Sequence, residues 1–147
     1  MGSKDAVLHD IDTGDTKPIQ TSLRRLSPTK IQQQEVKVAE MLKGGQIEPS
    51  DGPWSSPTVL VKKKDGKLWF CVDYRRLNCV TKKDAFPLPP INDSLRMLAD
   101  QQWFSTLDLA SGYWQVGLTD KAKEKSAFAT PAGIFQFKVM PRRPWRD

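Results

Sequence analysis

The feature that most constrains this fold is the dipeptide Asp65-Gly66, which separates two runs of strand-forming residues. These runs are Thr58-Val-Leu-Val-Lys-Lys-Lys64 and Lys67-Leu-Trp-Phe-Cys-Val-Asp73. Glycine accepts the positive φ of a tight turn, so Asp-Gly between two such runs is among the strongest short signals for a β-hairpin. The predicted tip is either a solvated turn or a basic finger that closes on phosphate. Its lysines are Lys62, Lys63, Lys64 and Lys67.

A helix is predicted before this hairpin. Ser27-Pro28 is a helix start, with a hydroxyl cap followed by proline at the first helical position. The apolar residues Ile31, Val38 and Leu42 follow at helical spacing, and we expect Gln32-Gln33-Gln34 to lie outside. Gly44-Gly45 ends the helix.

The second half of the chain predicts a connector, a short helix and another hairpin. Prolines at 87, 89 and 90 indicate an extended connector, and Ile91, Leu95 and Leu98 then share one helical face. We expect the segment with Lys121, Lys123 and Lys125 to be a solvated turn. Residues 126–130 and 134–139 predict a hairpin, in which Phe135, Phe137 and Val139 form the buried face.

Between these elements lies Phe104-Ser-Thr-Leu-Asp-Leu-Ala-Ser-Gly-Tyr-Trp-Gln-Val116. Phe104, Thr106 and Asp108 alternate with Ser105, Leu107 and Leu109, and this period of two predicts a strand with Asp108 held between two leucines. An unpaired carboxylate in an apolar strand is costly, so Asp108 needs a cation or a donor. The small residues that follow can present N–H groups to an anion. The stretch fits either a metal-bound nucleotide phosphate or a strand end whose Asp caps the next turn.

The amino-acid sequence of residues 104–116 closely resembles the first catalytic motif of reverse transcriptases from gypsy-type LTR retrotransposons. The resemblance extends in order over roughly residues 8–141 and includes the lead-in between protease and polymerase. The other similar segments are Ile47-Glu-Pro-Ser50, Trp54-Ser-Ser-Pro-Thr-Val-Leu-Val-Lys-Lys-Lys-Asp-Gly66, Phe70-Cys-Val-Asp-Tyr-Arg-Arg-Leu-Asn78, Ala85-Phe-Pro-Leu-Pro89 and Phe135-Gln-Phe-Lys-Val-Met-Pro141.

The resemblance implies an α+β fold, comprising the fingers and the first part of the palm of a right-hand polymerase. It divides the chain into a linker (1–27), fingers (28–82 and 117–141), the start of the palm (83–116) and a divergent tail (142–147). The activity implied is template-directed addition of deoxynucleotides to a primer 3′ end, in a Pol polyprotein that also carries ribonuclease H. The implied partners are an RNA or DNA template–primer and a deoxynucleoside triphosphate.

The same resemblance assigns roles to individual residues. Asp108 would be catalytic and hold two Mg²⁺ ions, and the Leu109 carbonyl would hold one of them. Lys63 would meet the triphosphate, together with the N–H groups of Ser111 and Gly112. Tyr113 would stack under the sugar and reject ribonucleotides.

Two positions complicate this assignment. Relatives usually carry a phosphate-gripping arginine where this chain has Trp69, and tryptophan cannot neutralise phosphate. Arg75 and Arg76 could contact template phosphates, or Arg75 could pair with Asp73.

The pattern of the family stops after Pro141, and the later Tyr-x-Asp-Asp turn, which supplies two further carboxylates, is not found in this sequence. One aspartate cannot assemble a near-octahedral magnesium site. We therefore expect the 147-residue polypeptide to be inactive alone, partly ordered in the fingers, frayed around Asp108 and prone to self-associate. The alternatives are a non-catalytic basic module that binds nucleic acid or a polymerase partner, and a product that does not fold stably.

Composition narrows the choice of partners. A net charge of +6 favours a polyanion, and no apolar run approaches the ~20 residues that span a bilayer. The two cysteines, Cys71 and Cys79, make neither a disulfide framework nor a zinc site, and Cys71 is expected to be a small core residue. These features predict an intracellular protein, cytoplasmic or nuclear, without a membrane partner. They leave its oligomeric state open.

Overall fold

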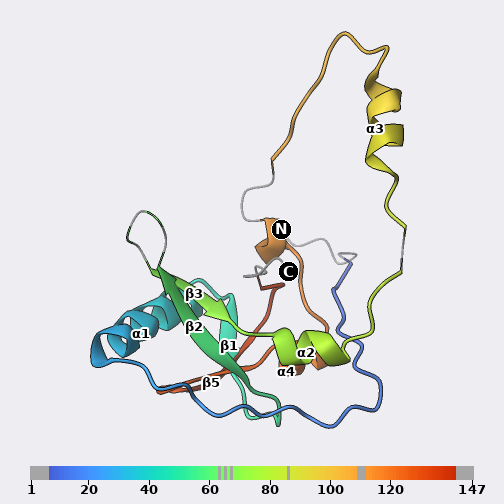
Figure 1. Cartoon of the computed structure of the whole chain (residues 1–147). Coiled ribbons are helices and arrows are strands. Elements are labelled where there is room, and N and C mark those ends of the chain that lie inside the picture. The colour runs from blue at the N-terminus through green and yellow to red at the C-terminus, as the bar shows by residue number, and fades with distance from the viewer. Residues whose placement is uncertain are drawn as a thin grey trace.

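The computed structural model describes residues 7–62, 64, 66, 68–85, 87–108 and 112–141, with Tyr113 described by its backbone alone. The core of the fold is a mixed sheet, whose strands β1, β2, β3 and β5 are labelled in Figure 1. The five strands follow the order β1-β5-β4-β2-β3. The β2–β4 pair is parallel and the other pairs are antiparallel. The strands are β1 (Ile47–Pro49), β2 (Ser56–Lys62), β3 (Leu68–Val72), β4 (Phe128–Thr130) and β5 (Gly133–Phe137).

The hairpin predicted around Asp65-Gly66 is confirmed as β2 and β3. Their pairing runs from Thr58 opposite Val72 to Lys62 opposite Leu68. At the tip, the structure describes Lys64 and Gly66, and Lys64 lies in a turn. Gly66 has a φ of +80°. This positive φ is the conformation for which the turn needs glycine.

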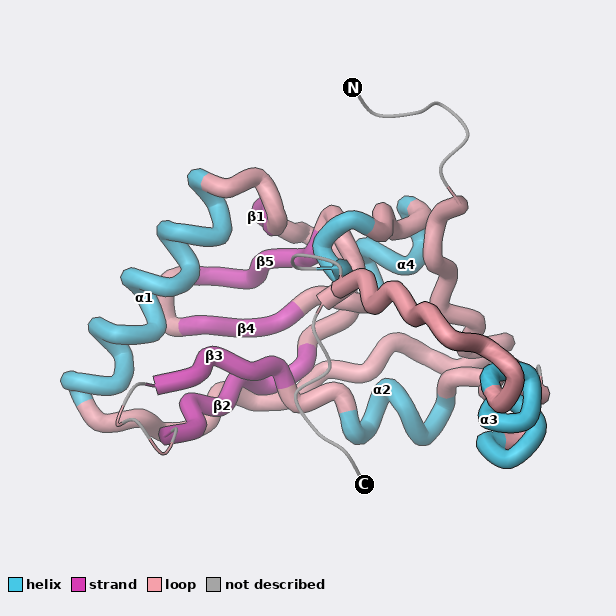
Figure 2. Tube along the Cα trace, turned by 90° about the horizontal axis from the view of Figure 1, so that it is seen from above, coloured by secondary structure: helices cyan, strands magenta, loops and turns pink. Residues whose placement is uncertain are grey.

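Helix α1 (Pro28–Lys43) is confirmed at both ends, although the Ser27 side chain makes no capping hydrogen bond. The helix runs across the strands and contacts both β1 and β3 (Figure 2). The expectation that Gln34 lies outside is wrong, because its side chain is fully buried. Gln34 stands three residues after Ile31 and four before Val38, so it shares their helical face.

A cluster of aromatic rings forms the centre of the core. Phe128 is fully buried, and its ring centroid lies 5.5 Å from that of Phe70, 5.2 Å from that of Phe137 and 6.1 Å from that of Phe135. Phe135 and Phe137 are buried as their alternation predicted. Cys71 is also buried, which confirms it as a small core residue.

The segment with the three lysines is a helix and not the expected turn. Helix α4 (Asp120–Lys125) begins at Thr119, whose hydroxyl accepts a hydrogen bond from the Ala122 N–H at 3.2 Å. Ala122 is fully buried and fixes the helix against the core, while Lys121 is exposed and Lys123 and Lys125 are half-buried. Sequence periodicity alone misses so short a helix, because it presents one apolar residue per turn.

Residues 7–26, here called the lead-in, lie along the sheet and its helices. The His9 N–H donates to the Gly117 carbonyl at 2.8 Å, and the Thr119 N–H donates to the His9 carbonyl at 3.1 Å. Further along, the Lys82 N–H donates to the Asp12 carbonyl at 2.7 Å. These hydrogen bonds tie residues 82 and 117 to residues 9–12 of the lead-in. We call this connection the neck.

The neck lies at the base of a long loop. Residues 83–108 of this loop are here called the arm. The predicted helix is present as α3 (Ile91–Leu98), but none of its residues is buried. Figure 1 shows α3 at the far end of the arm, away from the sheet. Leu107 is 93% exposed and Trp103 is 91% exposed.

The predicted strand before Leu109 is wrong for its described part. Residues 104–108 are irregular, and no strand within the described ranges pairs with them. An alternating pattern becomes a strand only when a neighbour accepts its backbone hydrogen bonds. Within the part of the chain that the structure describes, no helix has the length and apolar character to cross a membrane.

Candidate functional site

Asp108 lies at the end of the described arm and is exposed to solvent. Of the residues predicted to surround a nucleotide, Lys63, Leu109 and Ser111 lie outside the described residues. Gly112 begins the short 3₁₀ helix η1 (Gly112–Gln115), and Tyr113 in the same helix is described without its side chain. The structure thus gives positions for Asp108 and Gly112 and does not test their predicted roles.

The described residues do not fit a magnesium site by themselves. No group of three or more His, Cys, Asp or Glu side chains that could hold a metal ion occurs among them. Magnesium binds in near-octahedral geometry, with carboxylates, waters and substrate phosphates as its ligands. Asp108 would supply one ligand and would need further carboxylates beside it.

A cluster of hydrogen bonds and ion pairs in the described structure centres on Asp73, which directly follows β3. Its carboxylate is almost buried and accepts from Arg75 Nε at 2.9 Å, Arg75 Nη2 at 2.7 Å and the Arg75 backbone N–H at 3.2 Å. Arg24 Nη2, from the lead-in, donates to the same carboxylate at 2.8 Å. The Arg75 guanidinium, helped by Arg24, lowers the pKa of Asp73 although burial opposes this.

These bonds decide between the alternatives for Arg75 only in part. Arg75 does pair with Asp73, yet its side chain stays 73% exposed. Charge-assisted bidentate bonds hold the guanidinium in one orientation. Arg76 follows on the same helix and lies 3.4 Å from Thr21, measured from Nη1 to Oγ1. The predicted template contacts remain a prediction.

Helix α2 (Arg75–Val80) carries these arginines and is itself firmly placed. The Tyr74 hydroxyl donates to the Ser126 carbonyl at 2.6 Å, and Leu77 is buried beside Trp54 and Ala127. Burial raises the pKa of the Tyr74 hydroxyl well above its usual value, so it stays a neutral donor. The arginines therefore project from a helix whose start is fixed to the core.

Sequence reasoning missed Arg24 and the role of Asp73 as a shared anchor. A local signal existed for Asp73, because an aspartate at a strand end can cap the helix that follows. No local signal existed for Arg24, which lies 49 residues from Asp73 in the sequence. A contact of that separation follows only from the path of the lead-in.

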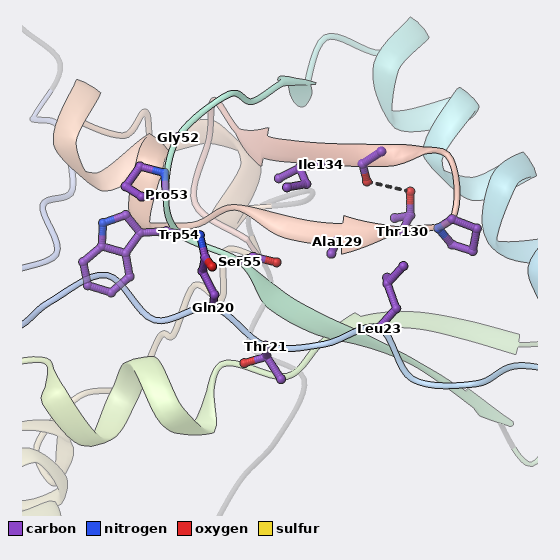
Figure 3. Close-up of a pocket in the computed structure, with 12 residues that line it drawn as sticks. Gln20, Thr21, Leu23, Gly52, Pro53, Trp54, Ser55, Ala129, Thr130 and Ile134 are labelled. Atoms are coloured by element: carbon purple, nitrogen blue, oxygen red, sulfur yellow. Dashed lines mark hydrogen bonds between the residues drawn. The ribbon is translucent and has the colours of Figure 1, made fainter.

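A groove of about 370 Å³ adjoins this cluster of arginines. Figure 3 shows the lead-in on one side, the turn before β2 on another, and the connection between β4 and β5 on the third. Thr130 Oγ1 donates to the Gly133 carbonyl at 3.0 Å and closes that connection. Thr21 lines the groove and also contacts Arg76, so the groove and the arginines share a border. The lining residues are Gln20, Thr21, Leu23, Gly52, Pro53, Trp54, Ser55, Ala129, Thr130, Pro131, Gly133 and Ile134.

Comparison with known proteins identifies the family. Residues 61–142 match the family model described as reverse transcriptase (RNA-dependent DNA polymerase). This chain belongs to the reverse transcriptase family. The match covers the end of β2, all of β3, Asp73 with helix α2, the arm and the hairpin of β4 and β5.

The reverse transcriptase assignment extends over most of the chain. The Retrovirus-related Pol polyprotein from transposon 297 of Drosophila melanogaster is 34% identical over 140 residues, which is 92% of this chain. The Pol polyprotein from transposon gypsy of the same species is 34% identical over 145 residues. These matches confirm the resemblance to retrotransposon reverse transcriptases. The chain spans 13% and 14% of the length of these two relatives.

Solved structures support the same fold for this reverse transcriptase chain. The native Prototype Foamy Virus Protease-Reverse Transcriptase is 26% identical, with a TM-score of 0.75 over 92% of this chain and 18% of that one. The foamy viral protease-reverse transcriptase in complex with an RNA/DNA hybrid has the same TM-score at 21% identity, over 94% of this chain and 19% of that one. The predicted α+β polymerase fold is therefore confirmed.

Proposed function

We propose that this chain forms the fingers and the first part of the palm of an RNA-directed DNA polymerase encoded by a retrotransposon Pol polyprotein. The observation that carries the proposal is the family match over residues 61–142, which includes the end of β2, all of β3 and Asp108. The division into a linker up to residue 27, fingers (28–82 and 117–141) and early palm (83–116) belongs to this proposal. The substrate would be a template–primer with deoxynucleoside triphosphates.

Within that polymerase each predicted residue has a separate task. Asp108 and the Leu109 carbonyl would supply magnesium ligands once further carboxylates complete the site. Ser111, Gly112 and Lys63 would hold the triphosphate. Tyr113 would contact the sugar, and Arg75 and Arg76 would contact the template strand.

A nucleic-acid partner has independent physical support. The chain carries a net charge of +6, and Arg75 and Arg76 are exposed on a helix fixed to the core. A related foamy viral enzyme was solved with an RNA/DNA hybrid bound. Because a template–primer of this kind occurs in the cytoplasm or nucleus, we propose that the protein acts in one of these compartments.

Binding to an RNA/DNA template–primer tests the proposal. The affinity of the 147-residue chain should fall steeply with salt, with no sequence preference. If five phosphates of a duplex are contacted, log K should fall against log salt with a slope of about −4.5. An affinity that stays constant between low and physiological salt would contradict the proposal.

A second candidate function is a non-catalytic nucleic-acid-binding module. Two observations favour it: Trp69 stands where relatives carry a phosphate-gripping arginine, and Asp108 has no carboxylate cluster around it among the described residues. The two functions share the predicted affinity for nucleic acid. They differ in whether Asp108 is needed for the incorporation of deoxynucleotides into a primer.

Primer extension on a poly(A) template with Mg²⁺ or Mn²⁺ separates the two candidates. We expect no incorporation by the 147 residues alone. Incorporation above a protein-free blank that disappears in Asp108→Asn would establish catalysis by this chain. For a longer Pol polypeptide that contains this sequence, loss of incorporation in Asp108→Asn with unchanged template binding would support the polymerase role.

A further inference from the structure

The cluster around Asp73 holds more positive than negative charge. Two guanidiniums, from Arg24 and Arg75, share the single oxygen Oδ2 at 2.8 and 2.7 Å. Among the described residues, no second carboxylate pairs with either arginine. One carboxylate between two guanidiniums leaves an excess of one positive charge, and Arg76 beside them adds another.

Both guanidiniums keep donors that face solvent. A guanidinium has five N–H donors, of which Arg75 gives two to Asp73 and Arg24 gives one. The side chains remain 48% exposed for Arg24 and 73% exposed for Arg75, whereas that of Asp73 is 8% exposed. The carboxylate thus fixes two arginines from beneath and leaves their outer edges open to a ligand.

The location suits an extended polyanion. Arg24 directly follows Leu23, which lines the groove, and Thr21 in the same segment contacts Arg76. A strand that passes along the lead-in would meet the arginines with its backbone and the groove with its bases. Arginine forks match phosphate geometry and are weakly hydrated, so fixing two of them lowers the entropic cost of binding.

We propose that Arg24 and Arg75, both anchored on Asp73, form a clamp for one backbone phosphate of a nucleic-acid strand. This inference rests on the proposed function and adds Arg24, from the lead-in, to its binding residues. The clamp makes the lead-in part of the nucleic-acid interface and not only a connector.

The test measures binding of a fluorescent single-stranded RNA dodecamer to the full chain over a range of salt concentrations. Arg24→Gln should weaken binding about fivefold or more at low salt and reduce the log–log slope by about 0.7. Arg25→Gln is the matched control, because it removes the same charge from the neighbouring exposed residue. It should weaken binding less than twofold.

Asp73→Asn separates a clamp from general charge attraction. The substitution raises the net charge by one, so attraction alone predicts tighter binding. The clamp predicts weaker binding, because the two arginines lose their common anchor. Arg24→Lys should recover only part of the affinity, since lysine keeps the charge and loses the fork. Thermal melting of each variant establishes that the compared proteins are folded.

The outcomes are distinct. Equal effects of Arg24→Gln and Arg25→Gln overturn the clamp and leave the proposed function intact, as does tighter binding by folded Asp73→Asn. Equal displacement of the RNA by a polyglutamate peptide of matched charge overturns the assignment to nucleic acid. Absence of binding by the wild-type chain overturns the clamp and the proposed function together.

Discussion

The sheet with its helices and the arm contain similar apolar residues in opposite environments. Phe128 in the sheet is fully buried, whereas Leu107 in the arm is 93% exposed and Trp103 is 91% exposed. In the sheet, Phe128 and Phe137 share one buried cluster with Val38 of α1. The arm has an equally apolar helix face and no covering layer among the described residues. Apolar content therefore gives a stable core only where two layers meet.

The same contrast holds for carboxylates. Asp73 beside the sheet accepts four hydrogen bonds from two arginines. Asp108 in the arm is exposed, and no carboxylate cluster forms around it within the described ranges. The described residues thus surround Asp73 with two arginines, whereas they place no further carboxylates in a metal-binding group with Asp108.

The largest expected difference follows from truncating one apolar side chain in each region. Phe128→Ala should lower the free energy of unfolding by about 3–5 kcal/mol, because it removes the ring at the centre of the core. Leu107→Ala should change it by less than about 0.5 kcal/mol, because its side chain is already in water. Urea unfolding followed by circular dichroism measures both. A loss above 2 kcal/mol in Leu107→Ala would mean that the arm packs against something in solution.

A smaller difference is expected from placing a charge in each region. Gln34 Nε2 donates to Thr58 Oγ1 at 2.7 Å, and Gln34 Oε1 is buried with no partner among the described residues. Gln34→Glu should cost about 3 kcal/mol at pH 7, because it buries an uncompensated carboxylate. Gln34→Met should stay within about 1 kcal/mol of the wild type, since it removes the unsatisfied oxygen and keeps the volume. The same unfolding assay compares them.

The arm supplies the control for that substitution. Gln101 is exposed, so Gln101→Glu should leave the free energy of unfolding within about 0.5 kcal/mol of the wild type. If Gln34→Glu were as mild as Gln101→Glu, the interface between α1 and the sheet would be open to water.

The smallest effect is expected from the ion pairs of Asp73. The Arg75 guanidinium lowers the pKa of Asp73 below its usual 3.8, so its contribution is complete above that value and is lost as pH falls through the folded-state pKa. Asp73→Asn should therefore cost about 1–2 kcal/mol at pH 7 and progressively less below pH 4. Urea unfolding at pH 7, 5 and 3 measures the trend. Asp100→Asn in the arm is the charge-matched control, and an equal cost there would contradict the role of Asp73.

The success of the sequence-based predictions depended on how far apart the interacting residues are in the chain. The two hairpins and helices α1 and α3 were predicted from local pattern, as at Gly66 and Gly44. Helix α4 was expected to be a turn, because its sequence presents a single apolar residue. The strand expected before Leu109 was wrong, because a strand requires a partner that the pattern does not specify. Gln34 was misplaced because its polarity outweighed its position on the apolar face. Arg24 was missed because its partner is 49 residues away.

The neck sets how freely the arm can vary. Backbone hydrogen bonds join residue 82 to Asp12 and residue 117 to His9, so the segment that contains the arm has both of its ends fixed. The entropic cost of closing such a loop rises slowly, by about 0.6 kcal/mol for each doubling of its length. Residues could therefore be gained or lost between these two points with little effect on the sheet. We therefore expect selection on the length of this segment to act through the arm's own contacts more than through folding.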